Sequence, residues 1–400
     1  MADSLVAAEQ NPVSITPPEN GTWFAEVSTK SVADTDTDRR SDVEAKQVWV
    51  YNLLRETGCE GLLVLEPDNF GWLTSGGSSR GILDPGELPV LFFSGEQRCI
   101  ICSNVETQRL FDEEVDGLGF QLKEWPWHWG RDQLLADLCH GRKMACDRPA
   151  LDCQIVGDQL RKRRRILSPY EQACFRALGS LLSHALEATC RGLAPTQTER
   201  DVAGQLGHRL LHRGAQPVSI SVAGSGRSRM YRQCGFTPAV VGNLCVLTAS
   251  ARKYGLYATA SRAVSFGPLA DELRKEFETT CKIMATYVGA TWTDSVPKAI
   301  LNSGKRVYQI NGFEHEWRLS PQGFVTGRDL VGVPLNYQTE ELLQSGWAVT
   351  WQASVGAAVH CDTYLITDQG PEAITTPESW PQKRVRYHGA DILLPFVLER

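Results

Sequence analysis

Apolar positions in the first half of this chain form short runs that alternate with helical patterns. Residues 41–44 (SDVE) have the form of a helix capping box, and apolar residues follow at helical spacing as far as Gly58, which predicts a helix. Further helical patterns lie near 105–114 and 131–139. Apolar runs that predict buried strands occur at 61–66, 89–93, 98–103 and 143–146. Alternating strands and helices are typical of an α/β layer domain.

The second half of the chain has a different order of elements. Ser168 and Glu171 form another capping-box pattern, which predicts the start of a long helix. A second capped helix is predicted from Thr196 to about Arg213, closed by Gly214. Strands are predicted at 218–223, 243–250, 348–354 and 363–367, and another helix from Pro268 to about Val288. Strands at hairpin spacing between helices predict an α+β domain built on an antiparallel sheet.

Chain length and local composition suggest where the domains divide. Four hundred residues are enough for two domains with separate cores. Residues 1–40 are rich in Ser, Thr, Asp, Glu and Pro and have few apolar positions, which predicts a mobile arm. We therefore expect an arm over 1–40, an α/β domain over 41–165 and a second domain over 166–400.

Charge excludes some partners. The formal net charge of -6 and a pI near 5.8 give no long-range attraction to nucleic acid or to an anionic membrane. Because the sequence has neither a long apolar span nor a basic start followed by an apolar core, we expect a cytoplasmic protein without a membrane partner. The basic run at 161–165 (RKRRR) is compatible with nucleic-acid binding or nuclear import, but the acidic context favours a solvated helix end.

Three local patterns have a structural and a chemical interpretation. Cys99 and Cys102 form a C-x-x-C within an apolar strand, which favours strand packing over a redox or zinc site. The twelve cysteines are expected to be reduced thiols. His208 and His212 lie four apart on a predicted helix but lack the carboxylate of a metalloprotease motif, which favours an exposed helix face. The glycine-rich stretch at 75–81 precedes no helix, so we predict a loop rather than a phosphate site.

Three stretches of sequence carry a resemblance to a known family. They are EPDNFGWLTSG (66–76), RRRILSPYEQACFRALG (163–179) and GLAPTQTERDVAGQL (192–206). They resemble the pita-bread family, which includes methionine aminopeptidases, aminopeptidase P, prolidase and creatinase. The resemblance implies an α+β chain with a C-terminal pita-bread domain preceded by a creatinase-type α/β N-terminal domain.

The family's peptidases bind two metal ions through two aspartates, a histidine and two glutamates, and each position can be sought here. When the signature D-x-G-x-x-x-x-G-Y-x-x-D-x-T-R is aligned on Gly255 and Arg262, both aspartate positions hold threonine. By the same resemblance, all five ligand positions have lost the metal-binding residue: Thr248, Thr259, Pro321, Gln352 and Cys361. These side chains do not offset the cost of dehydrating divalent ions, so we predict neither a metal site nor a cofactor.

Polar residues near these positions are the remaining candidates for chemistry. The predicted catalytic set is His360 and Asp362 for acid/base work, Asp329 without an assigned role, and Cys361 as a nucleophile if a nearby cation lowers the pKa of its thiol. The predicted substrate-binding set is Arg227, Tyr231, Arg232, Gln233, Arg262, Arg328, Trp351 and Gln352. Several arginines around one cavity suit a carboxylate-bearing substrate. Trp317 and Trp351 are expected to form either an apolar wall or core.

Two functions are compatible with these residues. The resemblance implies a metal-independent, creatinase-like enzyme that acts on a small carboxylate-bearing amino-acid derivative by C–N hydrolysis, elimination or rearrangement. However, Gln233 stands where a creatinase-type histidine is expected. The alternative is a catalytically inactive pseudopeptidase that serves as a binding module. The resemblance also implies a homodimer in which one subunit's N-terminal domain helps to close the pocket of the other.

Overall fold

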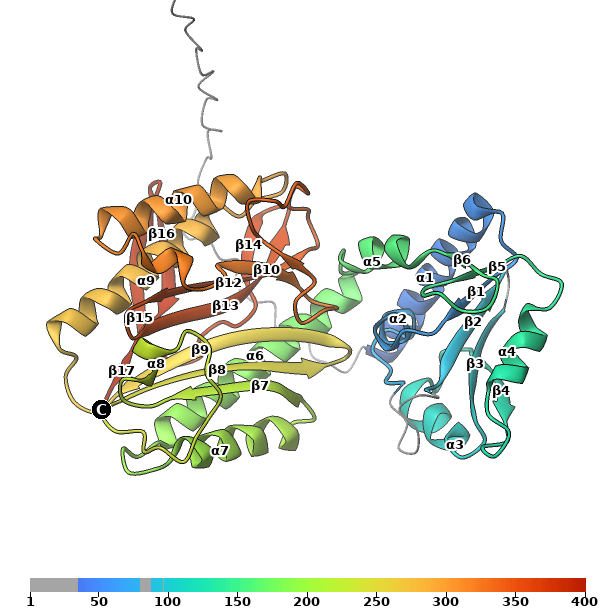
Figure 1. Cartoon of the computed structure of the whole chain (residues 1–400), viewed down its shortest axis with the longest axis horizontal. Coiled ribbons are helices and arrows are strands. Elements are labelled where there is room, and N and C mark those ends of the chain that lie inside the picture. The colour runs from blue at the N-terminus through green and yellow to red at the C-terminus, as the bar shows by residue number, and fades with distance from the viewer. Residues whose placement is uncertain (1–34, 80–87, 96) are drawn as a thin grey trace, which may run out of the picture.

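The computed structural model describes residues 35–79, 88–95 and 97–400. Figure 1 shows these residues as two groups of elements. One group holds a single sheet with one long helix and several short ones, and the other holds the remaining sheets between two layers of helices. The helix α5 (Gly157–Arg164) lies where the groups meet.

The first group is built on a six-stranded mixed sheet. Every residue of its β1 is buried, because core clusters cover both faces of the sheet. Across the sheet the strands are β4 (Gln121–Trp125), β3 (Arg98–Ser103), β2 (Val90–Ser94), β1 (Gly61–Val64), β5 (Met144–Cys146) and β6 (Gln154–Ile155). The helices are α1 (Thr35–Thr57), α2 (Pro67–Leu73), α3 (Thr107–Arg109), continued by the π-helical turn Leu110–Glu114, and α4 (Asp132–Cys139). All four predicted strands of this region are present.

The first helix begins earlier than predicted. Because α1 starts at Thr35, Ser41 and Glu44 lie inside it and do not form a capping box. A tertiary contact accompanies the earlier start, since the Arg39 guanidinium donates hydrogen bonds to the carbonyls of Thr74 (3.1 Å) and Glu114 (2.6 Å). Most of the predicted arm lies outside the described residues, as does part of the predicted loop at 75–81. The division at residue 165 stays a prediction.

The second group contains two main sheets and a hairpin, with antiparallel pairing except where residues 398–399 run parallel to residues 264–265. The first sheet has the order β17 (Leu398–Glu399), β9 (Leu256–Ser265), β8 (Leu244–Lys253), β7 (Gln216–Ala223). The second has the order β11 (Val333–Pro334), β10 (Gly323–Thr326), β12 (Ala348–Val355), β13 (Ala358–Thr367), β14 (Gly370–Ala373). The hairpin joins β15 (Gln382–Tyr387) to β16 (Ala390–Pro395). Strands with helices on their outer faces confirm the predicted α+β class.

Helices cover one face of each sheet, and β9 runs beside β13 between the two layers (Figure 1). The first sheet is covered by α6 (Pro169–Gly192) and α7 (Glu199–His212), and the second by α9 (Asp271–Gly289) and α10 (Pro297–Ile310). The shorter helices are α8 (Arg227–Met230) and the 3-10 turn Glu316–Arg318. The capping box that was predicted to open α6 is present, whereas α7 begins only after Thr198. Within the described part of the chain, no helix is long and apolar enough to cross a membrane.

The basic run at 161–165 lies at the end of α5 and makes ion pairs. Arg164 is buried and contacts Asp329 at 2.5 Å, while Arg165 contacts Glu341 at 2.6 Å. Both carboxylates belong to the second group of elements. The run is therefore not only a solvated helix end, because two of its arginines connect the groups.

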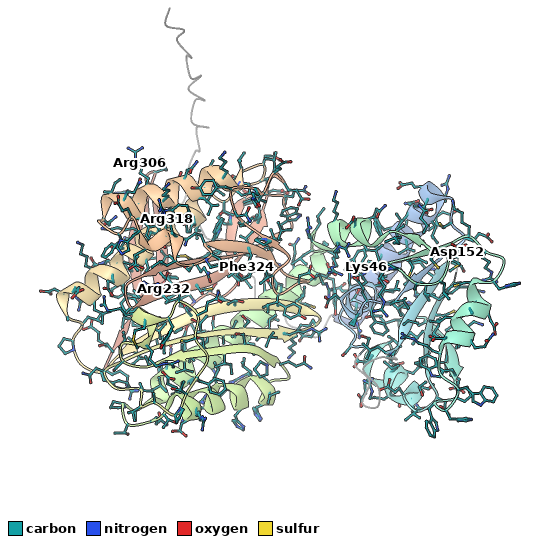
Figure 2. All side chains as sticks on the ribbon, viewed as in Figure 1. Lys46, Asp152, Arg232, Arg306, Arg318 and Phe324 are labelled. Carbon is teal, nitrogen blue, oxygen red and sulfur yellow. The ribbon has the colours of Figure 1, made fainter. Side chains whose placement is uncertain are left out.

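A buried set of charges, which we call the junction cluster, also connects the two groups: Asp42, Lys46, Glu171 and Arg328. Lys46 on α1, labelled in Figure 2, contacts Asp42 at 2.6 Å and Glu171 at 2.7 Å. Arg328 contacts the same Glu171 carboxylate at 2.5 Å. Burial by itself would raise the pKa of Glu171, but Arg328 and Lys46 lower it to about 2. Glu171 is therefore a charged group held between two cations.

Candidate functional site

The first part of the candidate site is the hairpin of β8 and β9. Tyr254 and Gly255 connect these strands with positive φ angles of 56° and 65°, as a two-residue hairpin turn requires. The pairing places Thr248 opposite Ser261 and Ser250 opposite Thr259. Because side chains alternate along a strand, these four hydroxyl residues share one face of the sheet. The intervening residues, such as Leu247 and Ala260, pack in the core under α6.

The second part is the strand pair of β12 and β13. Thr350 pairs with Thr363 and Gln352 with Cys361, so these four side chains lie on one face. The neighbouring positions on both strands point to the opposite face, toward α9. There the Trp351 ring stacks on Tyr287 at 4.9 Å.

The two pairs meet where β9 lies beside β13. The backbone N–H of Cys361 donates to Ser261 Oγ at 2.7 Å, and Thr363 Oγ1 donates to the carbonyl of Thr259 at 2.8 Å. The Gln352 side-chain amide donates to the carbonyl of Pro321. Strand pairing and these bonds connect all five positions that the resemblance assigns to lost metal ligands. We call this surface the hydroxyl face: Thr248, Ser250, Thr259, Ser261, Thr350, Gln352, Cys361 and Thr363.

Hydroxyl groups on and beside the hydroxyl face bond to one another. Ser250 Oγ lies 2.8 Å from Thr259 Oγ1, and Thr350 Oγ1 lies 2.9 Å from Thr363 Oγ1. All four residues are buried. Buried hydroxyls must be hydrogen-bonded to avoid a desolvation penalty, and here they satisfy each other. The region is thus a polar core with its own internal bonding.

The residues at the five positions do not fit a divalent metal pair. Hydroxyl, amide and thiol side chains with a proline supply neither the carboxylates nor the imidazole that such ions need. Burial raises the pKa of the Cys361 thiol well above its usual range, which disfavours the thiolate that binds metal. Among the described residues, no group of three or more His, Cys, Asp or Glu is arranged to hold a metal ion.

The predicted catalytic residues are divided between the two faces of β13. Cys361 lies on the hydroxyl face, whereas His360 and Asp362 point toward the helix side. His360 Nε2 lies 3.0 Å from Asp362 Oδ2, and His360 Nδ1 lies 3.9 Å from the Cys281 thiol of α9. A Cys361 nucleophile requires a cation that lowers the pKa of its thiol. Arg262 acts in that direction, but burial outweighs it and the pKa of Cys361 is raised. The structure therefore does not bring the three residues together.

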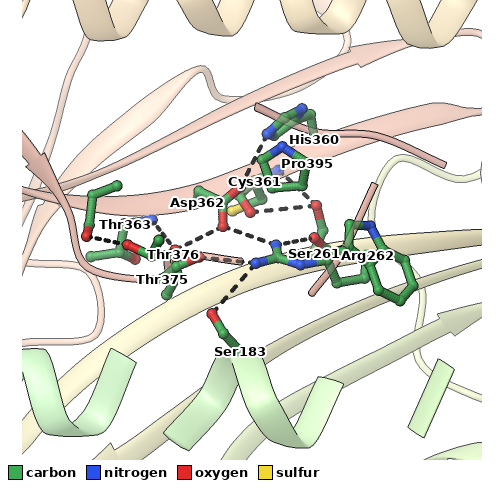
Figure 3. Close-up of polar contacts among 12 residues, drawn as sticks. Ser183, Ser261, Arg262, His360, Cys361, Asp362, Thr363, Thr375, Thr376 and Pro395 are labelled. Carbon is green, nitrogen blue, oxygen red and sulfur yellow. Dashed lines mark hydrogen bonds and ion pairs between the residues drawn. The ribbon is translucent and has the colours of Figure 1, made fainter. Parts of the chain in front are cut away.

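Asp362 is the centre of a buried network, drawn in Figure 3. It accepts hydrogen bonds from Arg262 at 3.1 Å and from Thr375 at 2.7 Å. Burial would raise the pKa of Asp362, but Arg262 and the bond to His360 lower it. Arg262 is completely buried and also contacts Glu187 at 3.7 Å. A cavity of about 10 Å³ beside Arg262 and His360 has room for about one water molecule.

The arginines of the predicted substrate-binding set lie in separate ion pairs. Each is paired with a different carboxylate: Arg227 with Glu199, Arg232 with Glu316, Arg262 with Asp362 and Arg328 with Glu171. Asp329, predicted to be catalytic, is likewise paired with Arg164. A guanidinium removed from water needs a carboxylate partner, and sequence reasoning missed these partners because they lie far away along the chain. Trp351 is fully buried, donates to Thr291 at 2.9 Å and belongs to the core.

Residues 230–236 form an exposed segment beside the hydroxyl face. Tyr231 is 51% exposed, and Gln233 is also exposed. Arg232, labelled in Figure 2, ties the segment to Glu316 at 2.5 Å and to the carbonyl of Gly356. Cys234 Sγ lies 3.3 Å from Ser221 Oγ, on the strand next to Thr248. These residues border the part of the face that remains partly exposed.

Solved structures of other proteins superpose on most of this chain. The prolidase from Pyrococcus horikoshii OT3 is 16% identical, covers 85% of this chain and 99% of its own, and superposes with a TM-score of 0.69. Dipeptidase PepE from Mycobacterium ulcerans is 16% identical, with 90% and 99% coverage and a TM-score of 0.70. The N-terminal domain of FACT complex subunit SPT16 from chickpea, Cicer arietinum, is 10% identical, with 85% and 96% coverage and a TM-score of 0.62.

These similarities establish the fold. The chain has the α+β pita-bread fold, and the resemblance predicted from its sequence is confirmed at that level. At 10–16% identity the likeness does not extend to activity. No family model matches the sequence, and no curated protein does either.

Proposed function

We propose that this chain is a catalytically inactive member of the pita-bread fold that serves as a binding module. The observation that carries the proposal is the hydroxyl face. At the positions where the resemblance places metal ligands, this chain has uncharged side chains: Thr248, Thr259, Pro321, Gln352 and Cys361. Thr259 bonds to Ser250, and the neighbouring hydroxyls of Thr350 and Thr363 bond to each other. Such groups hold the strands together, but without carboxylates or imidazoles they are poor ligands for a divalent metal pair and poor acids and bases near neutral pH.

The positions of the acid/base candidates support the same proposal. A general base must reach its substrate within hydrogen-bonding distance. His360 and Asp362 are each at most 5% exposed and bond to each other on the helix side of β13. The neighbouring cavity has room for about one water molecule, which is too small for an amino-acid derivative.

The partly exposed residues suggest the class of ligand. Ser221, Thr248 and Gln352 offer uncharged hydrogen-bonding groups, while Tyr231 and Gln233 are exposed in the adjoining segment. Uncharged donors and acceptors beside an aromatic ring suit a ligand with amide groups and an apolar side chain. We therefore expect an uncleaved peptide segment rather than a small carboxylate, because the nearby arginines are already paired.

A metal-independent, creatinase-like enzyme is the competing hypothesis. It requires turnover of a small carboxylate-bearing substrate that depends on the His360–Asp362 pair or on Cys361. Opening of the helix side would be needed to expose that pair. The hypothesis therefore predicts that His360→Asn abolishes turnover, whereas the binding proposal predicts no turnover to abolish.

The test combines metal analysis, turnover and binding. The purified full chain is expected to hold less than one equivalent of zinc, manganese, iron or cobalt, and to cleave no Xaa-Pro dipeptide, creatine or related amidine. In a peptide-array experiment, Thr248→Val and Gln352→Leu are expected to weaken binding about tenfold, which corresponds to about one lost hydrogen bond. Thr293→Val, at an exposed position outside the hydroxyl face, is the matched control.

Each result bears on the proposal. Binding that is lost in the two face variants and kept in the control would support it. Turnover by the wild-type chain or full metal occupancy would overturn it. Binding that neither face variant weakens would overturn it as well. Circular dichroism of every variant checks that the fold is retained.

Organisation and location belong to the same proposal. We propose a second domain over 166–400 that carries the binding site, an N-terminal domain over 41–165, a homodimer and a cytoplasmic location. The family resemblance supports the dimer, and light scattering of the purified chain would measure it.

A further inference from the structure

The outer edge of β7 is open beside the hydroxyl face. β7 is the last strand of its sheet, and it pairs with β8 along one side (Figure 1). Among the residues that the structure describes, no strand pairs with its other side, where a backbone hydrogen bond joins the Val222 N–H to the carbonyl of Gly235 at 3.2 Å. Val218 is 41% exposed, and Ser219 is also exposed. The sheet therefore has an accessible edge.

The backbone of Ile220 points toward this open side. In an antiparallel pair, successive residues direct their N–H and C=O groups alternately toward the partner strand and away from it. Val222 points away from β8, because its N–H bonds to Gly235. Ile220 lies two positions earlier in an unbroken register and so points away as well. Its N–H and carbonyl are thus a donor and an acceptor on the edge.

The side chains of β7 divide between two environments. Ser221 lies opposite Thr248 and Ser219 lies opposite Ser250, so both serines are on the side of the sheet that carries the hydroxyl face. Ile220 points to the other side, where it packs against the core and approaches α7. A strand added at this edge would therefore place alternate side chains over the hydroxyl face and over α7.

Cationic side chains lie at the Gln216 end of β7. Gln216 pairs with Arg252 of β8, and the next residue, Lys253, donates from Nζ to the carbonyl of Arg213 at 2.8 Å. Within the described ranges, neither Arg213 nor Lys253 has a carboxylate partner, and Arg213 is exposed. Unpaired cations attract carboxylates of a ligand, so this end of the edge suits an acidic one.

We infer that the outer edge of β7 binds an extended segment of a partner protein, antiparallel to β7, with acidic residues toward the C-terminal end of that segment. The inference rests on the proposed binding function and specifies how the peptide is held. A strand added to an open sheet edge gains affinity from backbone hydrogen bonds and specificity from alternate side chains. Antiparallel pairing brings the C-terminal end of the segment to Arg213 and Lys253.

The same edge disfavours pairing with a second copy of the chain. Pro217 lacks a backbone N–H, and the register with β8 shifts between Pro217 and Ser219. Proline and bulges at a sheet edge limit edge-to-edge pairing of whole strands. β7 also contains no Asp or Glu that could meet Arg213 and Lys253 of another copy. A short acidic segment is therefore the better complement.

The experiment measures binding of a fluorescein-labelled peptide, Thr-Val-Thr-Val-Glu-Glu, to the full chain by fluorescence anisotropy. Ile220→Pro removes the outward N–H, and proline is tolerated where the N–H of an edge strand faces solvent. We expect this variant to bind about tenfold more weakly, which corresponds to about one lost hydrogen bond. Ile220→Val keeps the N–H and is the matched control, with an expected change of less than about twofold.

The charge of the edge is tested separately. A peptide with Lys-Lys in place of Glu-Glu is expected to bind at least about tenfold more weakly. Arg213→Gln and Lys253→Gln are each expected to weaken binding of the acidic peptide about threefold, and added salt should affect these variants less than the wild-type chain. Lys298→Gln, at an exposed lysine of α10, is the matched control and should bind as the wild type does.

A measurement on the peptide keeps the test decisive if Ile220→Pro does not fold, which circular dichroism would show. The backbone nitrogens of the peptide are methylated one at a time. Because only alternate N–H groups face β7, methylation at one alternate set should weaken binding about tenfold and at the other set less than about twofold. Equal effects at all positions would rule out strand addition.

The outcomes separate this inference from the proposed function. If Thr248→Val and Gln352→Leu weaken peptide binding but Ile220→Pro binds as the wild type does, the binding function stands and the inference at β7 is wrong. Equal binding of the Glu-Glu and Lys-Lys peptides, or no binding of either by the wild-type chain, would overturn it too. A change in oligomeric state of Ile220→Pro, measured by light scattering, would assign the edge to a second copy and overturn it likewise.

Discussion

The junction cluster and the hydroxyl face are both buried and polar, but they satisfy their side chains in opposite ways. In the junction cluster two carboxylates contact two cations at 2.5–2.7 Å. In the hydroxyl face uncharged groups bond to one another at 2.8–2.9 Å. A polar group that loses water needs a partner, and either solution supplies one. The chain thus keeps buried charge where its two groups of elements join and has uncharged side chains at the five positions that the resemblance assigns to lost metal ligands.

Removing the central charge of the junction cluster is expected to have the largest effect on stability of the changes considered for these two regions. Glu171→Gln leaves Lys46 and Arg328 buried, with Asp42 as the only remaining carboxylate of the cluster. We expect the free energy of unfolding to fall by about 3–5 kcal/mol, because uncompensated buried charge is costly. Urea denaturation measures the loss.

The control for this prediction is Glu44→Gln, in the exposed ion pair with Arg40. There we expect a change of less than about 1 kcal/mol. Equal effects of the two substitutions would mean that the junction cluster does not hold the groups together.

Acid should remove the contribution of Glu171 gradually. Its pKa in the folded chain is lowered to about 2, whereas a free glutamate titrates near 4.3. A lowered carboxylate pKa stabilises the fold above the unfolded value, and this stabilisation is lost as pH falls from about 5 to 2. The difference in unfolding free energy between wild type and Glu171→Gln should therefore be constant near neutrality and shrink across that interval. A difference that is independent of pH down to 2 would contradict the assignment.

The smallest effect is expected on the hydroxyl face. Thr259→Val removes one member of the Ser250–Thr259 pair and leaves the other hydroxyl buried, which should cost about 1–2 kcal/mol. The double variant Ser250→Ala, Thr259→Val removes both partners and should cost less than the sum of the single changes. A double-mutant cycle measured by thermal unfolding gives the coupling. Strictly additive losses would show that the two hydroxyls do not stabilise each other.

Local patterns predicted most of the elements. The apolar run at 243–250 indicated β8, and Ser168 with Glu171 marked the start of α6. The same capping pattern failed at Ser41, because the helix already begins at Thr35 and Arg39, two residues before Ser41, makes long-range contacts. β4 and α10 were not predicted, since four of the five β4 residues are exposed and its sequence has no apolar run.

The candidate site was predictable only in part. Resemblance to family motifs located Thr248, Thr259, Pro321, Gln352 and Cys361, and strand pairing and hydrogen bonds connect these positions. The sequence could not show that the arginines are paired elsewhere, because partners such as Glu199 or Glu316 lie 28 and 84 positions away. Nor could it show which face of the sheet His360 occupies.

The sequence by itself determined the types of side chain at each position: hydroxyls, an amide and a thiol where metal ligands are expected, and apolar residues at the spacing of strands and helices. Tertiary structure alone decided which of these side chains meet. It separated Cys99 from Cys102 and placed Glu171 between Lys46 and Arg328. The physical reason is that periodicity is a local property of the chain. The cost of burying a polar side chain depends instead on the partners that it contacts in the folded structure.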